Sequence, residues 1–397
     1  MAESRFPRNR VVFIMPRFRH DDVRVSHKEA WGLAQLGFDV TLVCQAAPVT
    51  SYLGMHVIAA RAVAQNAIFR SIANLPRLVA QALKLDADIY VLENPDTLFL
   101  GFVLVVLRKR VVYSTHEDFA AKMELRDEIP RWLRGFASRT VRMLELTLAH
   151  LCDGTVVTQI GLVEKYGRKA ILVENAPLTR GPVVEQAREY YAELTAKHHP
   201  LLAYSGGLTL DRGLLRMLDL LLELRHSRDW RLKLVGWFHP ADLETLVRRH
   251  PAWPYVDYIG RVPHALSLAH IRSGTLGLVL LDDIADYRYT SPNKLYEYMA
   301  LETPFVASDF VNWRRSVDGT PAGLFVDPLD VDGIAQQIAE LVEDDERLRA
   351  MAVAGRQFIT DRFNWGNVAR PMETLIIELA QSTRSPVFYA DESARRS

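Results

Sequence analysis

The chain has 397 residues, of which 49% are hydrophobic and 24% charged, with 48 basic and 48 acidic side chains. This length suits two domains of ordinary size, and the composition excludes a disordered, collagen-like or disulfide-rich protein. The two cysteines, Cys44 and Cys152, end apolar runs, so we expect small core residues in a reducing compartment rather than a disulfide.

The two halves of the chain differ in charge. Residues 1–180 hold 24 Lys and Arg against 18 Asp and Glu, a net charge of +6, and the remaining residues therefore carry −6. This asymmetry indicates that the N-terminal half faces something anionic, such as a phospholipid surface or a lipid-diphosphate acceptor. Nucleic acid is not favoured, because no basic stretch is interleaved with stacking aromatic residues.

No segment has the pattern of a secretory signal or a membrane span. The start is polar and basic, and the longest apolar run, residues 98–107, is too short to cross a bilayer. That run predicts a buried helix beside a sheet, with a helix at a membrane interface as the alternative. We expect a cytoplasmic protein that can associate peripherally with the inner face of the cell membrane.

The N-terminal half alternates short β-rich runs with helical patterns. Several of the runs are continuous and apolar, as parallel strands buried on both faces are. This alternation predicts a doubly wound α/β sheet. Strands are expected at residues 10–15, 38–44, 55–59, 88–93, 110–114, 154–158 and 170–174, and helices at 25–36, 76–85 and 130–151.

The loop after the first strand, residues 16–24, is dense in charged side chains and lies at the carboxyl end of that strand. Arg24 and, four residues later, Lys28 are candidates to bind a phosphate group of an acceptor. A solvated loop is the alternative.

His116 follows a predicted buried strand at its carboxyl end, where open α/β sheets bind ligands. Its neighbours Glu117 and Asp118 are expected to orient the imidazole ring or to raise its pKa, and either carboxylate could act as a base. A purely structural histidine is the alternative.

Residues 131–142 combine basic and aromatic side chains. Trp132, Leu133 and Phe136 can share one helix face, while another face carries Arg131, Arg134, Arg139 and Arg142. Such a helix can lie on an anionic membrane surface, and it can equally be a packed helix with a solvated basic face.

The strand and helix pattern restarts in the second half, which indicates a second α/β domain. Strands are expected at residues 201–204, 231–235, 256–259, 276–280, 304–307 and 323–326, and helices at 214–226, 241–249, 292–300, 331–344 and 371–380.

The start of one helix in this half carries a specific pattern. Ser291 and Pro292 open the helix, whose first turn offers free backbone N–H groups and is a ready site for a diphosphate. Lys294 adds a positive charge there, and Asn293 can offer its backbone N–H. Glu297 lies about one turn deeper, where a carboxylate could bind sugar hydroxyls.

Upstream, Gly206 and Gly207 are expected in a loop that lets the backbone approach a ligand, and Arg212 follows at a distance suited to a loop-to-helix turn. No metal site is predicted, because the nearest candidate pair, Asp282 and Asp283, lacks the D-x-D spacing.

Four segments together resemble the family 4 glycosyltransferases, which have the GT-B fold. The run of His, Glu and Asp at residues 116–118 is similar to that of one bacterial branch that builds surface glycans. The resemblance is specific for fold and reaction class, and not for the sugar. The segments are 22–30 with 36–43, 112–118, 204–208 with 211–213, and 291–300 with 304–308.

The resemblance implies two Rossmann-like doubly wound domains that face a central cleft. We place an acceptor-side domain at residues 1–178, a linker at 179–198, a nucleotide-sugar domain at 199–365, a helix that crosses back at 366–381 and a loose tail at 382–397. The implied reaction moves a sugar from a nucleotide-diphosphate sugar to a lipid-linked or polysaccharide acceptor, with retention and without a metal or a cofactor.

Residue roles also follow from the resemblance. His116 is expected near the reacting centre, where it contacts the donor sugar or the acceptor. Arg212 and Lys294 are expected to neutralise the diphosphate, and Glu297 to bind the ribose. The remaining donor contacts are expected from Gly206, Gly207, Ser291, Pro292 and Asn293.

The chain departs from the family pattern at two positions. Gly207 stands where the family has a first basic residue, so Lys294 is expected to take that role. Tyr289 stands where the family has the first glutamate of an E-x7-E pair, so the donor sugar must be held in another way, and Asp286, Tyr287 and Tyr289 are the nearby candidates.

These departures keep two alternatives open. One is a GT-B nucleotide-sugar epimerase, which would need a pair of carboxylates near the anomeric carbon, and none is evident in the sequence. The other is a non-catalytic glycan-binding or scaffold protein. A dehydrogenase is disfavoured, because no G-x-G-x-x-G follows the first strand.

Overall fold

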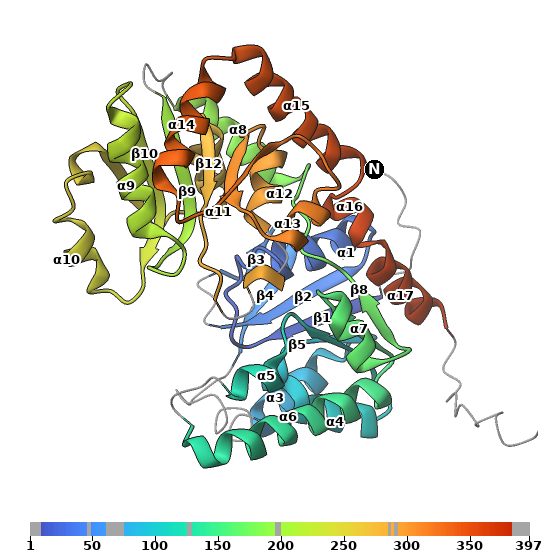
Figure 1. The fold of residues 1–397 in the computed structure, drawn as a ribbon. Helices are drawn as coiled ribbons and strands as arrows, with labels where there is room; N and C mark the ends of the chain where they lie inside the picture. The colour runs from blue at the N-terminus through green and yellow to red at the C-terminus, as the bar shows by residue number, and fades with distance from the viewer. Residues whose placement is uncertain are drawn as a thin grey trace, which may run out of the picture. The chain divides into compact units, whose positions relative to one another are not determined.

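The chain forms two compact units, which are described separately (Figure 1). The N-terminal unit comprises the described residues of Met1–Glu174 and Ala369–Ser397, and the C-terminal unit those of Asn175–Val368. The structure, a computed structural model, describes residues 9–45, 49–60, 75–124, 129–194, 200–284, 287–289 and 293–382.

The N-terminal unit is built on an eight-stranded sheet in the order β3-β4-β2-β1-β5-β6-β7-β8. Its strand pairs are parallel except for the antiparallel pair of β3 and β4. The sequence predicted each of these strands except the two-residue β3, which is too short to show a pattern. The strands are β1 Arg10–Met15, β2 Asp39–Cys44, β3 Ser51–Tyr52, β4 Met55–Ala59, β5 Ile89–Glu93, β6 Arg110–Thr115, β7 Gly154–Val157 and β8 Ala170–Leu172.

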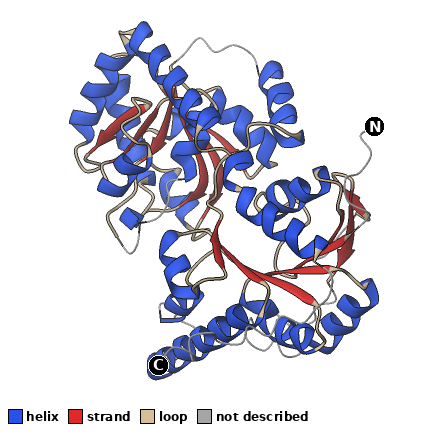
Figure 2. Ribbon diagram, turned by 90° about the vertical axis from the view of Figure 1, so that its right-hand side faces the viewer, coloured by secondary structure: helices blue, strands red, loops and turns tan. Residues whose placement is uncertain are grey.

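Helices cover both faces of this sheet (Figure 2). The predicted helix at 25–36 begins as a π-helix and continues as an α-helix, and the apolar run at 98–107 forms α4, which buries Leu98, Leu100 and Leu104 against the sheet. The helices are η1 Val25–Ala30, α1 Trp31–Gln35, α3 Leu75–Leu85, η2 Pro95–Thr97, α4 Leu98–Val106, α5 Phe119–Glu124, α6 Arg131–Leu151, α7 Ile160–Tyr166 and α17 Arg370–Gln381. No described helix is long and apolar enough to cross a membrane.

The last helix, α17, belongs to the N-terminal unit although it lies at the far end of the sequence. It contacts β5 and β8 and buries Met372 and Ile376. Leu375 packs directly on Gly154 of β7, since a Cβ at that glycine would lie 2.5 Å from a Leu375 methyl carbon. The chain therefore returns to its first sheet after completing the second unit.

The C-terminal unit holds a six-stranded parallel sheet in the order β11-β10-β9-β12-β13-β14. Its strands are β9 Leu201–Leu208, β10 Arg231–Phe238, β11 Val256–Gly260, β12 Leu276–Val279, β13 Phe305–Ser308 and β14 Gly323–Val326. Its helices are α8 Pro182–Glu193, α9 Leu214–Arg225, α10 Leu243–Val247, η3 Trp253–Tyr255, α11 His264–Arg272, η4 Tyr287–Tyr289, α12 Asn293–Ala300, α13 Val311–Ser316, α14 Val331–Val342, α15 Asp345–Asp361 and α16 Trp365–Val368.

The segment expected to link the domains contains a packed helix. Residues 182–193 form α8, which buries Val183 and Ala187 against Ala265 of α11. The apolar stripe of this helix is short and interrupted by charged residues, so the sequence pattern alone resembled a linker.

The glycine pair expected in a loop lies within β9 instead. Gly206 pairs in register with Gly236 of β10, and Gly207 pairs with Trp237, so the strand runs on to Leu208. A Cβ on Gly236 would lie 1.8 Å from the Gly206 carbonyl oxygen. The two strands approach this closely because neither residue has a side chain.

We predict that two glycines with the same backbone angle respond differently to alanine. Gly213 and Gly260 both have φ = +77°, but a Cβ at Gly213 would lie 2.0 Å from the Leu280 carbonyl oxygen, whereas Gly260 faces open space. Gly260→Ala should cost about 1–2 kcal/mol of unfolding free energy for the left-handed backbone alone. Gly213→Ala should cost clearly more, because the end of β12 must shift; thermal unfolding followed by tryptophan fluorescence measures both. Equal losses would contradict the close approach.

Candidate functional site

Two cations lie side by side at the carboxyl end of β9. A Cβ at Gly206 would be 3.0 Å from Lys294 Nζ, and a Cβ at Gly207 would be 3.1 Å from Arg212 Nη1. The absence of side chains at both glycines therefore makes room for the two charged groups. We call Arg212 and Lys294, with the two glycines beneath them, the cation pair.

Tyrosines fix the geometry around the cation pair. The Tyr204 hydroxyl donates to the Gly207 carbonyl oxygen at 2.9 Å, and Lys294 Nζ lies 5.4 Å from the centroid of the Tyr204 ring. Tyr287 of η4 donates to Asp211 and also interacts with Arg212. Of the residues expected to hold the donor sugar, Tyr287 thus lies at this site. The side chains of Asp286 and Tyr289 lie outside the described part of the structure, so their roles stay predictions.

The electrostatics of the cation pair favour an anion. Burial, and next the charge of Arg212, lower the pKa of Lys294 to about 8, while Glu297 acts in the opposite direction. Within the described part of the chain neither cation forms an ion pair with a carboxylate. An anion placed here would meet two donors and the N-terminal end of α12.

The other predicted donor residues lie on α12 or just before it. Asn293 is its first residue, and its side-chain oxygen is buried without a hydrogen-bond partner. Glu297 lies one turn further and is half-buried. Ser291, Pro292 and Asp286 lie outside the described residues, so their predicted roles stay predictions.

Sequence reasoning missed an exposed aromatic residue next to the cation pair. Trp237 is 49% exposed although it lies in β10, and it pairs in register with Gly207. The Arg261 guanidinium, which follows β11, lies 5.1 Å from the centroid of its ring. A tryptophan just beyond the end of a predicted strand, two residues before His239-Pro240, was the available signal, but the strand was expected to end at residue 235.

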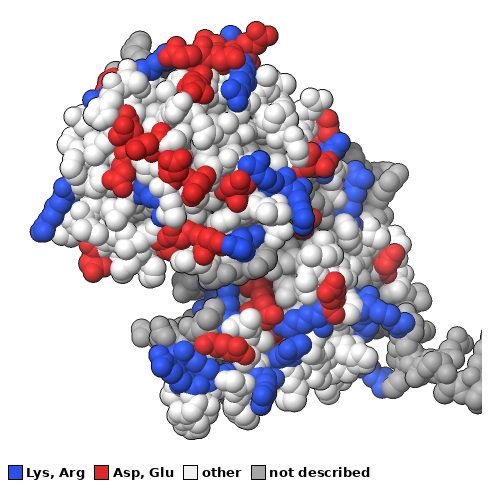
Figure 3. Space-filling view, viewed as in Figure 1, with Lys and Arg blue, Asp and Glu red and all other residues white. Residues whose placement is uncertain are grey.

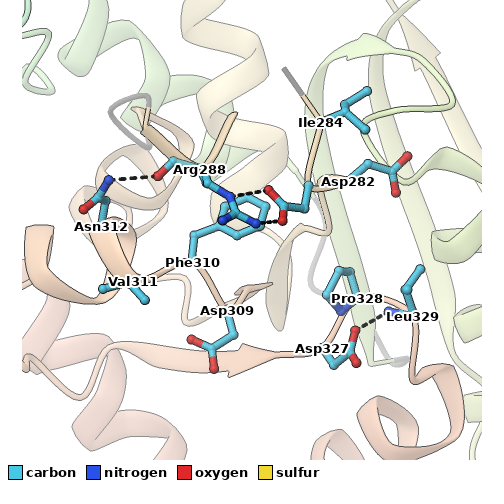
Figure 4. A pocket seen from close by; sticks show the side chains of 11 residues that line it. Asp282, Ile284, Arg288, Asp309, Phe310, Val311, Asn312, Asp327, Pro328 and Leu329 are labelled. Carbon is cyan, nitrogen blue, oxygen red and sulfur yellow. Dashed lines mark hydrogen bonds and ion pairs between the residues drawn. The ribbon is translucent and has the colours of Figure 1, made fainter. Parts of the chain in front are cut away.

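A cavity of about 690 Å³ opens at the carboxyl ends of β12, β13 and β14 (Figure 4). Its wall carries four carboxylates, and three of them have guanidinium partners: Asp282 pairs with Arg216, Asp283 with Arg288 and Asp309 with Arg314. The fourth, Asp327, accepts a hydrogen bond from the Leu329 backbone at 2.9 Å. The cavity contains neither member of the cation pair.

A second cluster lies at the carboxyl edge of the N-terminal sheet. Arg24 Nε is 2.8 Å from a Glu29 oxygen, and His116 Nε2 is 3.1 Å from a Glu93 oxygen. The glutamate side chains have no exposed surface, and that of His116 is 16% exposed. Glu29 lies on η1, and Glu93 ends β5 beside the strand that leads to His116.

Burial, and next the charge of Arg24, lower the pKa of the His116 imidazole to about 4, so it is neutral near neutral pH. Glu117 acts in the expected direction and raises this pKa, but burial and Arg24 outweigh it. Glu117 also pairs with Lys122. Asp118 pairs with Lys165 at 2.9 Å. It also accepts a hydrogen bond from the Ala121 backbone N–H at 3.0 Å, in the first turn of α5.

The ligand atoms of Glu29, Glu93 and His116 lie within 4.8 Å of one another, a spacing from which a metal ion could be bound. The Arg24 guanidinium already stands against Glu29, however, and supplies the positive charge that a metal ion would supply. The donor set therefore does not favour a metal.

The two candidates for acceptor phosphate are both buried. Arg24 is 8% exposed and also donates from Nη2 to the Val173 carbonyl oxygen at 2.8 Å. Lys28 lies on η1 and is 4% exposed. Their predicted acceptor role stays a prediction, and the structure gives Arg24 a second role inside the unit.

The basic helix α6 presents two large aromatic side chains to solvent. Trp132 is 80% exposed and Phe136, one turn later, is 70% exposed, whereas Leu133 is half-buried. In Figure 3, Lys and Arg side chains gather on the N-terminal unit, and acidic side chains are spread over the C-terminal unit.

Two protein families match the chain and between them cover most of it. Glycosyltransferase Family 4 matches residues 23–165, and Glycosyl transferases group 1 matches residues 199–344. The chain belongs to these GT-B glycosyltransferases. The family and the two-domain fold expected from the sequence are thereby confirmed.

Curated relatives match parts of the chain. Glycogen synthase of Mycobacterium tuberculosis is 24% identical over 262 residues, 64% of this chain and 61% of the relative, so the chain spans about three fifths of the relative's length. A GDP-mannose-dependent alpha-(1-6)-phosphatidylinositol monomannoside mannosyltransferase of the same species is 34% identical over 73 residues, 18% of this chain and 19% of the relative.

Solved structures share the fold over nearly the whole chain. Sucrose-phosphate synthase from Thermosynechococcus elongatus has a TM-score of 0.70 and 18% identity, over 94% of this chain and 99% of its own. HepE from Anabaena, in complex with UDP and glucose, has a TM-score of 0.67 and 13% identity, over 93% of this chain and 100% of its own.

We predict that removing the Lys294 charge stabilises the protein. Its pKa falls from 10.5 to about 8 in the fold, so the folded state binds its proton less tightly than the unfolded state does. The resulting destabilisation is complete below about pH 8 and disappears as the pH rises to about 10.5. Lys294→Met should therefore raise the melting temperature at neutral pH, and the gain should shrink above about pH 8. Lys84→Met, at an exposed position of α3, is the control and should show neither effect.

Proposed function

We propose that this chain transfers a sugar from a nucleotide-diphosphate sugar to a lipid-linked or polysaccharide acceptor, with retention and without a metal ion. The observation that carries the proposal is the cation pair, in which Arg212 and Lys294 meet at the start of α12 with no carboxylate paired to either among the described residues. Such a site has the charge and the donors that a diphosphate needs.

The chemistry follows from that charge. When the bond between the anomeric carbon and the diphosphate oxygen breaks, negative charge develops on the leaving group. The acceptor hydroxyl oxygen forms the new bond to the anomeric carbon, and its proton passes to the departing diphosphate. Preorganised cations aimed at the developing charge are usually the largest catalytic contribution. Arg212 and Lys294 supply the neutralisation that a divalent metal would otherwise provide, which supports a metal-independent reaction.

The surroundings of the cation pair suit a nucleoside. Trp237, beside Gly207, offers an exposed ring on which a base can stack, with Arg261 as a cationic neighbour. Glu297, one turn into α12, is placed to accept hydrogen bonds from the ribose hydroxyls. The similar HepE structure contains UDP and glucose, which supports a UDP-sugar as the first donor to test.

The acceptor side is assigned to the N-terminal unit. His116 lies at the carboxyl edge of its sheet and is neutral near neutral pH, so it can exchange hydrogen bonds with a sugar hydroxyl. The excess of basic residues in this half and the exposed aromatic residues of α6 support an acceptor carried on an anionic membrane, at its cytoplasmic face.

We predict that Arg212→Ala and Lys294→Ala each lower turnover by about a hundredfold, the effect of losing one charge-stabilising group. The donor is found first, by screening UDP-, GDP-, dTDP- and ADP-sugars for thermal stabilisation of the parent protein. Nucleotide release is then measured with and without acceptor. Near-native turnover of both variants would contradict the proposed site. Conversion of the donor sugar without any acceptor would indicate an epimerase, and binding without turnover a non-catalytic protein.

We also predict that α6 binds anionic vesicles in a salt-dependent way. Charge attraction is screened over about 10 Å at 0.1 M salt, so sedimentation with anionic vesicles should fall as salt rises, with a remainder due to Trp132 and Phe136. Changing Arg131, Arg139 and Arg142 together to Ser should reduce binding, while Trp132→Ser should remove the salt-resistant part. Equal binding to neutral and anionic vesicles would refute membrane docking and leave α6 as a packed helix with a solvated face.

A further inference from the structure

Two carboxyl groups that carry no predicted role lie at the centre of the N-terminal unit's carboxyl edge. The side chains of Glu29 and Glu93 have no exposed surface, and their oxygens lie within 4.8 Å of each other and of His116 Nε2. We propose that the two carboxyl groups share one proton and hold His116 as the neutral tautomer with its hydrogen on Nε2, so that Nδ1 accepts a hydrogen bond from a sugar hydroxyl. Glu93 is then a positioning residue, and its link to the substrate rests on the proposed transferase function.

The charges of the cluster favour a shared proton. Arg24 stands 2.8 Å from Glu29 and neutralises one carboxylate. His116 does not neutralise the other, because burial keeps its imidazole uncharged near neutral pH. A second ionised carboxylate in the same dry site would therefore be poorly compensated, which is strongly disfavoured, and one proton removes that charge.

The geometry of the cluster indicates where the proton resides. The oxygens of Glu93 and Glu29 lie within 4.8 Å of each other, and two carboxyl groups can join in a hydrogen bond only when one of them is protonated, because a carboxylate has no hydrogen to donate. Burial raises the pKa of both groups, and the Arg24 guanidinium, 2.8 Å from Glu29, favours the anion there, so we assign the proton to Glu93.

The protonated Glu93 then fixes the histidine. Its hydroxyl donates to Glu29, which leaves its carbonyl oxygen, 3.1 Å from His116 Nε2, to accept a hydrogen from that nitrogen. Ser114 Oγ lies 3.4 Å from the same nitrogen. A neutral imidazole with its hydrogen on Nε2 keeps a lone pair on Nδ1, the nitrogen available to a substrate.

Two further carboxylates surround the cluster. Asp22, in the loop before η1, raises the pKa of both glutamates and so opposes a second ionised carboxylate. Glu117, directly after His116, raises the pKa of the imidazole, but burial and the charge of Arg24 outweigh this effect.

The tautomer can be measured without any substrate. Nitrogen NMR of protein labelled at histidine, with His116→Gln to assign the signals, distinguishes a protonated ring nitrogen from a bare one. We expect the hydrogen on Nε2 in the parent protein. Glu93→Gln should keep that tautomer, because its amide oxygen accepts from Nε2 while its NH₂ group donates to Glu29. Glu93→Leu should lose the preference. A hydrogen on Nδ1, or a doubly protonated ring, in the parent at neutral pH would overturn the proposal.

The shared proton also has a signature in stability. Because the fold raises the pKa of Glu93 from 4.5 to about 8, the folded state holds this proton more tightly, and stability falls as pH rises through that window. The melting temperature should drop less between about pH 6 and about pH 9 in Glu93→Gln than in the parent. Glu124→Gln, at an exposed position of α5, should behave like the parent. An equal drop in the parent and in Glu93→Gln would refute the shared proton.

Activity completes the test once a donor and an acceptor are known. Glu93→Gln should keep turnover close to that of the parent, while Glu93→Leu should lose about a hundredfold through misorientation of His116. If Glu93→Leu fails to fold, the tautomer of the parent and of Glu93→Gln still decides the question. Failure of the parent to transfer sugar would contradict the proposed function alone, since the tautomer and stability measurements need no substrate.

Discussion

Like charges repel, and the C-terminal unit nevertheless holds Arg212 and Lys294 side by side at the edge of its sheet. Much of the local structure serves this arrangement. Two glycines of β9 leave space for the two charged groups, and Gly236 lets the neighbouring strand stay in register beside them. Burial, and next the repulsion from Arg212, lower the pKa of Lys294, and an anion bound between the two groups would relieve that repulsion. The described residues of the unit are thus arranged for a charge that they do not themselves supply.

In the N-terminal unit, groups of the opposite charge lie close together at the carboxyl edge of the sheet. There, two carboxyl groups are buried, and among the residues that the structure describes the Arg24 guanidinium is the one that contacts them. The net charge of each half is opposite in sign to the charge of its buried groups. The basic half contains the carboxyl cluster, and the acidic half contains the cation pair. Net charge therefore describes the surface that a partner approaches, whereas the sites depend on a few buried groups whose charges contribute little to that total.

The parallel strands could be predicted because strands buried on both faces are continuous apolar runs, as at residues 10–15 and 110–114. Arg212 and Lys294 could be predicted because glycines and a helix start mark a phosphate site in the sequence itself. Glu29 and Glu93 could not, since each stands inside a helix or strand pattern and only the sheet order brings them together. Trp237 was missed for a related reason: β10 was expected to end before it, and the pairing that extends the strand is a contact between distant residues.

The return of α17 to the first sheet changes how the protein can be made. Most of the N-terminal unit leaves the ribosome before the C-terminal unit, but Leu375 and Ile376, which complete its packing, are synthesised only after the C-terminal unit. Domains generally fold as units while the chain grows, and this unit must wait until the entire C-terminal unit has been translated. During that interval the surface around Gly154 that α17 later covers is exposed to solvent. If translation stopped just before α17, the N-terminal unit would lack this helix, whereas all residues of the C-terminal unit would be present.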